Sequence, residues 1–113
     1  MPVTKEFDLK KYIVNQLRKI SRTWHEKDRA LLQALRSYGN YECAQCAKWF
    51  EKGQVQVDHI LPAVPVAGWD SFDGFISRLF CTYKDLQVLC KPCHSAKSKS
   101  ENAERRKYKK LNE

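Results

Sequence analysis

Four of the five cysteines fall into two pairs with the same spacing. The first pair is Cys43 and Cys46, with two residues between the thiols. The second pair, Cys90 and Cys93, repeats that spacing. Two such pairs can surround one tetrahedral ion with four thiolates and leave no open position, which is typical of a structural zinc site. Four unligated thiols are the alternative, but the spacing favours zinc. We therefore predict a structural Zn²⁺ that contributes to folding.

A carboxylate and two imidazoles form a second set of residues that could do chemistry. Asp58 and His59 are adjacent, and His94 directly follows Cys93. Neighbouring residues on a helix point about 100° apart, so Cys93 can face the zinc while His94 faces a second site. A carboxylate and one imidazole can hold a divalent ion, and the other imidazole can act as a general base near neutral pH. A surface pair or a buried polar pair remains the alternative for Asp58 and His59.

The chain is strongly basic. It has 113 residues, with 21 Lys and Arg against 13 Asp and Glu, which gives a formal net charge of +8. Such a charge on a small domain indicates a polyanionic partner, most commonly nucleic acid. In the basic C-terminal segment we predict that Lys97, Lys99 and Arg105 contact phosphates, with a solvated charged face as the alternative. Basic residues also cluster near the N-terminus, where they extend the footprint on DNA or aid solubility: Lys10, Lys11, Arg18, Lys19 and Arg22.

Length and apolar patterning exclude several classes of protein. The length suits one domain. No apolar run approaches the roughly 20 residues that cross a bilayer, and the N-terminus lacks an apolar signal segment. We therefore expect a cytoplasmic protein without a membrane partner.

The residues that could do chemistry must be positioned by helices and short strands. Apolar residues three and four apart predict a helix over residues 8–24 with Asp8 as its cap, and another over 24–38 that stops at Gly39. Two further helices are predicted over 71–81 and from about residue 93. Residues 48–57 are predicted as strand, turn and strand, residues 61–68 as a loop, and 86–89 as an apolar stretch. The large aromatic residues are assigned to the core rather than to base stacking: Trp49, Phe50, Trp69, Phe72, Phe75 and Phe80.

Taken together, these motifs resemble one family. The pattern Cys43-x2-Cys46, Val57-Asp58-His59-Ile60, Leu86-x2-Leu89-Cys90-x2-Cys93-His94-x2-Lys97 is similar to that of HNH endonucleases with a four-cysteine zinc site. It looks most like the small stand-alone HNH proteins of bacteriophages and prophages. The resemblance covers about residues 33–100 and leaves residues 1–32 unmatched.

The resemblance implies an α+β fold, with a zinc-stapled ββα-metal core and a helical N-terminal extension. We expect the extension over residues 1–40, packed on the nuclease core and basic C-terminal helix over 41–113, within a single domain. The implied activity is metal-dependent DNA cleavage. The net charge of +8 and the lack of an obvious base-reading module favour contacts mainly to the phosphate backbone, with little sequence preference. If the protein is phage-encoded, the bacterial host cytoplasm is its location, and a partner in packaging or recombination is left open.

Individual roles follow from the same resemblance. His59 is the implied general base that activates water, while Asp58 and His94 are the implied ligands of a catalytic divalent ion. That ion is Mg²⁺ or Mn²⁺, with Ni²⁺ or Zn²⁺ also compatible with an imidazole ligand.

Asp85 departs from the family pattern. It stands where relatives have an Asn that orients the base or ligates the ion. An added negative charge favours a protonated imidazole, so we expect catalysis by His59 with Asp85 to be shifted to more alkaline pH. A solvated turn residue is the alternative for Asp85.

Two competing functions stay open. A zinc-stabilised DNA-binding module with weak or no catalysis would tolerate Asp85, but it has no need of Asp58, His59 and His94 together. A RING-like or zinc-ribbon adaptor that binds protein fits the strongly basic charge less well.

Overall fold

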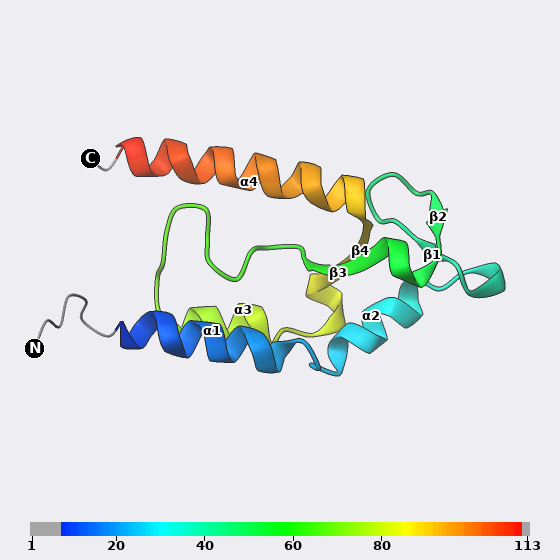
Figure 1. Ribbon diagram of the computed structural model, residues 1–113, viewed down its shortest axis with the longest axis horizontal. Coiled ribbons are helices and arrows are strands. Elements are labelled where there is room, and N and C mark those ends of the chain that lie inside the picture. Colours follow the sequence, from blue (N-terminus) through cyan, green and yellow to red (C-terminus); the bar gives the residue numbers. More distant parts are fainter. Residues whose placement is uncertain (1–7, 112–113) are drawn as a thin grey trace, which may run out of the picture.

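The computed structural model describes residues 8–111. Residues 1–7 of the predicted N-terminal extension and residues 112–113 of the predicted core segment lie outside that range. Within that range the chain is a small mixed α+β structure with four α-helices and two two-stranded antiparallel sheets (Figure 1). In chain order the elements are α1 (Leu9–Ser21), α2 (Glu26–Ala34), β1 (Tyr41–Glu42), β2 (Trp49–Phe50), β3 (Val55–His59), α3 (Phe72–Leu79), β4 (Leu86–Cys90) and α4 (Lys91–Leu111). The predicted helices and strands therefore all exist.

Two strands that follow one another in the sequence, β2 and β3, belong to different sheets. The predicted strand, turn and strand over residues 48–57 are present, but their two strands do not pair with each other. Instead β2 pairs with β1, and β3 pairs with β4, with Asp58 opposite Gln87 and His59 opposite Leu86. Alternation of apolar residues predicts that a segment forms a strand. Which strand it pairs with depends on contacts between residues that are distant in sequence.

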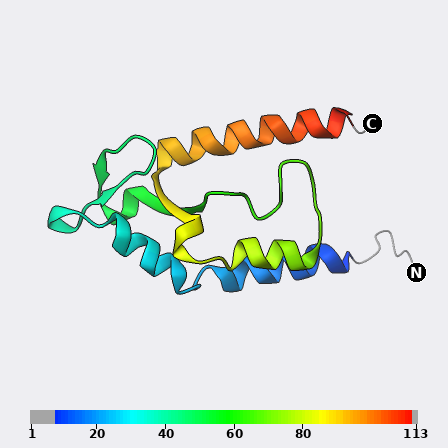
Figure 2. The same ribbon diagram turned by 180° about the vertical axis from the view of Figure 1, so that it is seen from behind.

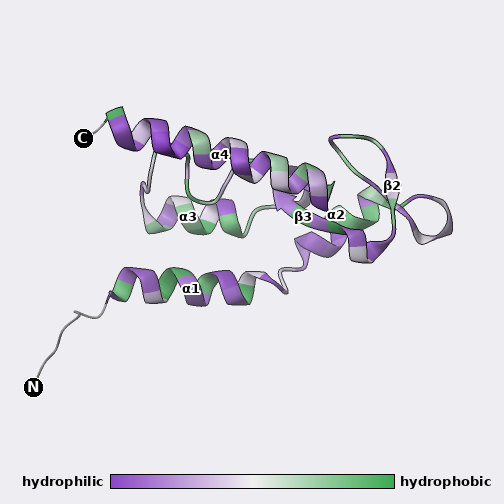
Figure 3. Ribbon diagram, turned by 45° about the horizontal axis from the view of Figure 1, so that its top comes forward, coloured by the Kyte–Doolittle hydropathy of each residue, from purple (hydrophilic) through white to green (hydrophobic). Residues whose placement is uncertain are grey.

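Helix α4 continues directly from β4, because Cys90 ends the strand and Lys91 begins the helix. It runs along one side of the molecule, while α1 and α3 lie side by side along the other, and the segment over residues 60–71 passes between them (Figures 1 and 2). Most of α4 is hydrophilic (Figure 3). No helix in residues 8–111 is both long and apolar enough to cross a membrane.

Helix α1 begins as predicted at the Asp8 cap, whose carboxylate accepts a hydrogen bond from the Lys11 N–H at 3.0 Å. Its residues Val14 and Leu17 pack on a cluster formed by Ala63 and the α3 residues Phe75 and Leu79. This contact attaches the N-terminal helix to the segment that follows β3.

Helix α2 is shorter than the predicted 24–38. It ends at Ala34, and Leu35 is already extended and forms a β-bridge with Tyr41. Tyr38 and Gly39 adopt left-handed conformations with φ of 58° and 73°, so the chain turns there outside any α-helix. Gly39 therefore supports a turn rather than the end of α2.

Two polar contacts attach this region to the rest of the fold. The indole Nε1–H of Trp24 donates to the Cys81 carbonyl at 2.6 Å, and the buried carboxylate of Glu26 accepts from the Tyr83 N–H at 3.0 Å. Both contacts join residues that are far apart in sequence, so they fix the position of α2 against the segment leading into β4.

Helix α3 is capped by the Ser71 hydroxyl, which accepts from the Gly74 N–H at 3.0 Å. Phe75 is fully buried, as predicted, and Leu79 is buried beside it. Trp49 was assigned to the core, and this prediction is wrong: half of its surface is exposed. It lies in the small β1–β2 sheet, and its indole donates to Glu42 rather than entering the apolar cluster.

Candidate functional site

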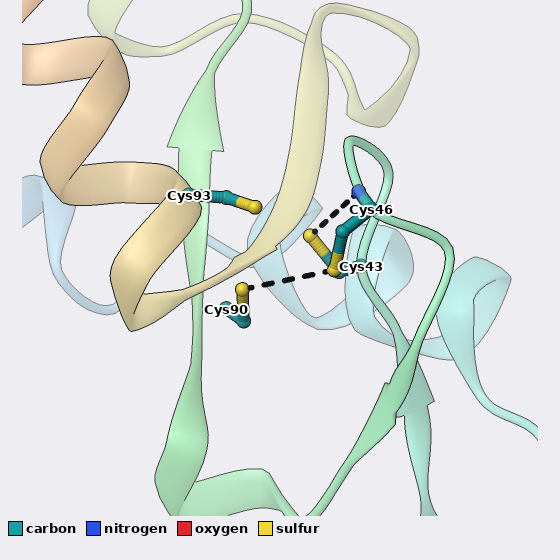
Figure 4. Close-up of side chains that lie close together, drawn as sticks. All are labelled: Cys43, Cys46, Cys90 and Cys93. Atoms are coloured by element: carbon teal, nitrogen blue, oxygen red, sulfur yellow. Dashed lines mark hydrogen bonds between the residues drawn. The ribbon is translucent and has the colours of Figure 1, made fainter.

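The four cysteines of the two pairs converge in space. Cys43 follows β1, Cys90 ends β4, and Cys93 lies in the first turn of α4 (Figure 4). All four Sγ atoms lie within 4.8 Å of one another, and the sulfurs of Cys46 and Cys90 are 3.9 Å apart. Zinc–sulfur bonds of about 2.3 Å in a tetrahedron place sulfurs roughly 3.8 Å apart, so a small contraction would close the shell. The cluster is a plausible site for structural Zn²⁺.

The turn between the first two cysteines is built for this convergence. The N–H of Ala47 donates to the Cys43 carbonyl at 2.9 Å, and Ala47 takes a positive φ of 63°. The N–H of Cys46 points at the Cys43 sulfur, at 3.5 Å. Such N–H donors to sulfur favour the thiolate form that binds metal.

Backbone donors and neighbouring thiols push the pKa values of two cysteines in opposite directions. Burial alone would raise the pKa of Cys43, but the N–H groups of Cys46 and Cys90 outweigh it and lower that pKa to about 6. The side chains of Cys90 and the other cluster thiols raise the pKa of Cys93 to about 12. A second thiolate beside the first is disfavoured until a cation compensates the charge.

Asp58 is the centre of a second polar cluster. Its Oδ1 lies 3.5 Å from His94 Nε2, while its Oδ2 accepts from Gln87 at 3.0 Å and lies 3.1 Å from Lys97 Nζ. Only 11% of the Asp58 side chain is exposed. Asp58 and His94 are therefore brought together from β3 and α4, while the adjacent Cys93 faces the thiol cluster, as the helical geometry predicted.

The ring of His59 is held by a backbone carbonyl. Its Nε2 lies 2.9 Å from the Leu79 oxygen at the end of α3. A carbonyl oxygen only accepts, so Nε2 carries a proton, and in the neutral imidazole Nδ1 then holds the lone pair. The backbone oxygen of His59 accepts from Lys97 Nζ at 3.0 Å, which also attaches β3 to α4.

The Asp58–His94 pair and His59 line one polar hollow of about 260 Å³. Its wall brings together Asp58, His59 and His94 with residues of α4 and one residue of α1. The charged and titratable residues that line it are Arg18, Asp58, His59, His94, Lys97, Glu101 and Arg105. The hollow therefore combines possible ligands of a cation with possible ligands of an anion.

The three basic residues predicted to contact phosphates are placed differently. Lys97 Nζ is bound between Glu101, at 2.8 Å, and Asp58. Burial lowers the pKa of Lys97, but these two carboxylates outweigh it and raise that pKa above its ordinary value. Arg105 lines the hollow and donates to the Val64 carbonyl at 2.8 Å, whereas Lys99 is exposed and does not line it. Their predicted phosphate contacts stay predictions.

Asp85 is not joined to His59 by a side-chain hydrogen bond within residues 8–111. Its carboxylate is exposed and lines a different hollow with Leu61 and Cys81, while its backbone oxygen accepts from the Ile60 N–H at 3.0 Å. The role predicted for Asp85 therefore stays a prediction.

Two residues of the cluster, Glu101 and Gln87, escaped the sequence reasoning. Glu101 lies four residues after Lys97 and seven after His94, a spacing that places it on the same helical face and could have identified it. Gln87 reaches Asp58 through the register of β3 and β4, which has no signal in the local sequence. Arg18 was named only as one of the basic residues near the N-terminus, and the structure places it in the wall of the hollow.

The chain matches no protein-family model, no curated protein and no solved structure in the three comparisons. Its function must therefore be inferred from its own residues and their arrangement.

Proposed function

We propose that the protein is a metal-dependent DNA endonuclease of the HNH type, with β3, β4 and α4 as its ββα-metal core. One observation carries the proposal. Asp58 and His94 come from different elements, contact each other at 3.5 Å, and line the same polar hollow as His59. A binding module requires no such convergence of a carboxylate and two imidazoles.

Asp58 and His94 are suited to hold the divalent ion. Neighbouring ligand atoms around a six-coordinate ion with bonds of about 2.1 Å lie about 3 Å apart, close to the separation of the two side chains. A carboxylate oxygen suits Mg²⁺ or Mn²⁺, and the imidazole also suits Ni²⁺ or Zn²⁺. When bound, the ion supplies Lewis-acid stabilisation of the phosphate and of the leaving oxygen.

His59 is the general base in this proposal. The Leu79 carbonyl fixes the protonated Nε2, so Nδ1 can accept a proton from a water molecule. The water oxygen then bonds to phosphorus as the bond to the 3′ oxygen breaks, and the 3′ oxygen takes a proton from solvent, which leaves a 5′-phosphate and a 3′-hydroxyl. The carbonyl orients the ring as the family Asn does in relatives, so Asp85 is not required for that purpose.

The structural zinc would act indirectly, by positioning His94. Cys90 and Cys93 flank the junction of β4 and α4, and His94 follows Cys93 in the first turn of α4. An ion bound by both thiolates fixes this turn, and with it the imidazole that faces Asp58.

One observation favours the alternative of a DNA-binding module with weak or no catalysis. The ammonium of Lys97 lies 3.1 Å from Asp58 and already supplies a positive charge to that carboxylate. A divalent ion must share Asp58 with Lys97 or displace it toward Glu101. If neither happens, the cluster is a structural ion pair on a DNA-binding surface.

Conversion of supercoiled plasmid to open-circle and linear forms tests the two functions. Zinc-loaded protein is incubated at several pH values with Mg²⁺ or Mn²⁺, beside His59→Ala and the control His25→Ala. His25 is the matched control, because it is exposed and lies outside the hollow. We expect wild type and His25→Ala to cleave and His59→Ala to lose cleavage, with equal zinc content in all three.

The other outcomes are equally informative. Salt-sensitive DNA binding without cleavage, under every ion, would replace the nuclease by the binding module. Equal cleavage by wild type and His59→Ala would show that His59 is not the base.

A further inference from the structure

Helix α1 contributes a side chain to the hollow that contains His59 and His94. That residue is Arg18, and Arg105 of α4 lines the same hollow. Helix α1 lies within residues 1–32, which the motif pattern does not cover. The other basic residues of α1 do not line the hollow, so Arg18 is the one cation that this helix contributes to it.

Neither arginine is neutralised by an acidic partner within residues 8–111. The guanidinium carbon of Arg18 lies 5.4 Å from the centre of the buried Phe75 ring, and the Arg18 side chain forms no hydrogen bond or ion pair within residues 8–111. Arg105 donates to the Val64 carbonyl and, at 3.3 Å, to the Asn102 side chain. No carboxylate of the described residues forms an ion pair with either guanidinium.

The remaining charges of the hollow are already paired. Lys97 is bound between Asp58 and Glu101, and His94 faces Asp58. An anion that enters the hollow therefore meets the two guanidinium groups as its unpaired cations. The Phe75 ring face holds Arg18 and the Val64 carbonyl holds Arg105, and neither of these partners carries a negative charge. The two guanidinium groups are therefore pre-organised for an anion.

We propose that Arg18 and Arg105 form a two-sided clamp on the backbone phosphates of the DNA strand in the hollow. The clamp rests on the proposed function, since it positions the strand whose phosphate is cleaved. A guanidinium can donate two parallel hydrogen bonds to one phosphate, which fixes orientation as well as supplying charge. Arg18 and Arg105 are positioning residues, and α1 is part of the active site rather than an appendage.

Helices α1 and α4 lie on opposite sides of the segment over residues 60–71, which agrees with a clamp closed from two sides (Figure 1). Pro62, Ala63 and Val64 of that segment line the same hollow as the two arginines. A strand bound by both arginines passes over this wall, with His59 and His94 beside it.

DNA binding, measured without cleavage, tests the clamp. The fluorescence anisotropy of labelled duplex DNA is titrated at several salt concentrations with zinc-loaded protein and no added divalent ion. Arg18→Gln is compared with Lys19→Gln, which removes the same charge from the next residue of α1 but lies outside the hollow. Arg18→Lys keeps the charge and loses the two-pronged donor.

For Arg18→Gln we expect Kd to rise roughly tenfold and the slope of log Kd against log salt to fall by about one. Lys19→Gln should change both quantities less, and Arg18→Lys should keep the slope while weakening binding. Equal effects of Arg18→Gln and Lys19→Gln, or an unchanged slope in Arg18→Gln, would overturn the clamp.

Failure of the clamp and failure of the proposed function give different results. If wild type cleaves plasmid but Arg18→Gln binds DNA normally, the nuclease stands and the clamp is wrong. If wild type never cleaves but Arg18→Gln selectively loses affinity, the arginines bind phosphate in a protein that is not a nuclease. Wild type that binds no DNA at any salt concentration would overturn both.

Discussion

Asp58 concentrates the chemistry of this protein in one carboxylate. His94, Gln87 and Lys97 all contact it, so its two oxygens are shared between a possible metal ligand, an amide and an ammonium. Whether a divalent ion binds there depends on competition with Lys97, because both cations use the same negative charge. At the scale of single residues, Lys97 therefore decides between the two proposed functions.

Removal of the Lys97 charge should strengthen divalent-ion binding. In Lys97→Gln the ammonium no longer competes for Asp58, and we expect the affinity for Mn²⁺ to rise on the order of tenfold, about 1.4 kcal/mol. Calorimetric titration of zinc-loaded protein measures this change. Lys99→Gln, which removes an exposed charge outside the hollow, is the control. Unchanged or weaker Mn²⁺ binding in Lys97→Gln would place the ion away from Asp58.

The thiol cluster predicts how zinc affinity changes with pH. Zinc must displace the Cys93 proton at every pH below about 12, whereas Cys43, with a pKa of about 6, is already a thiolate at neutral pH. Zinc affinity therefore falls as pH falls, and the dependence steepens by about one proton below pH 6. Competition with a chromophoric chelator between pH 5 and 8 measures the slope. The same slope on both sides of pH 6 would contradict the lowered pKa of Cys43.

At the scale of elements, buried polar contacts decide where α2 lies. Glu26, in the first turn of the helix, accepts a hydrogen bond from the Tyr83 backbone, just before β4. Its side chain is almost fully buried and the hydrogen bond is partly buried, so water competes less for this contact than at an exposed site. This contact holds the segment that leads into the strand carrying Cys90.

Loss of the Glu26 carboxylate should destabilise the fold. Glu26→Ala leaves the Tyr83 N–H unsatisfied, and we expect a loss of about 1 to 3 kcal/mol in the free energy of unfolding. Glu26→Gln retains a carbonyl acceptor and should lose less. Urea denaturation at saturating zinc, followed by circular dichroism, compares the variants. If Glu26→Ala and Glu26→Gln are equally stable, the hydrogen bond to Tyr83 contributes nothing measurable.

At the scale of the whole molecule, the four cysteines connect three parts of the chain. Cys43 and Cys46 lie between β1 and β2, Cys90 ends β4, and Cys93 lies in the first turn of α4. The apolar clusters are small, so a bound ion would supply a large share of the free energy of folding.

Disruption of the thiol cluster should therefore unfold much more than one turn. In Cys90→Ser we expect loss of bound zinc and a large fall in Tm, because one of four ligands is weakened and the ion stabilises only the folded state. Cys81→Ser is the matched control, since Cys81 is outside the cluster. Atomic emission gives the zinc content, and thermal unfolding gives Tm. A Cys90→Ser variant that keeps its Tm would show that the cluster needs no metal.

Much of this protein follows from local patterns in the chain. The Asp8 cap, the helical stripes and the spacing of the cysteine pairs act over a few residues, so they predict elements and metal ligands directly. The 100° step between Cys93 and His94 likewise predicts that they face different sites, and the structure confirms it.

Only the tertiary structure decided which distant residues meet. The pairing of β3 with β4 brings Gln87 to Asp58, the end of α3 brings the Leu79 carbonyl to His59, and the packing of α1 on Phe75 brings Arg18 to the hollow. Each of these contacts joins segments that many residues separate. No local pattern encodes such a meeting, because it depends on how the apolar surfaces of whole elements are buried against one another.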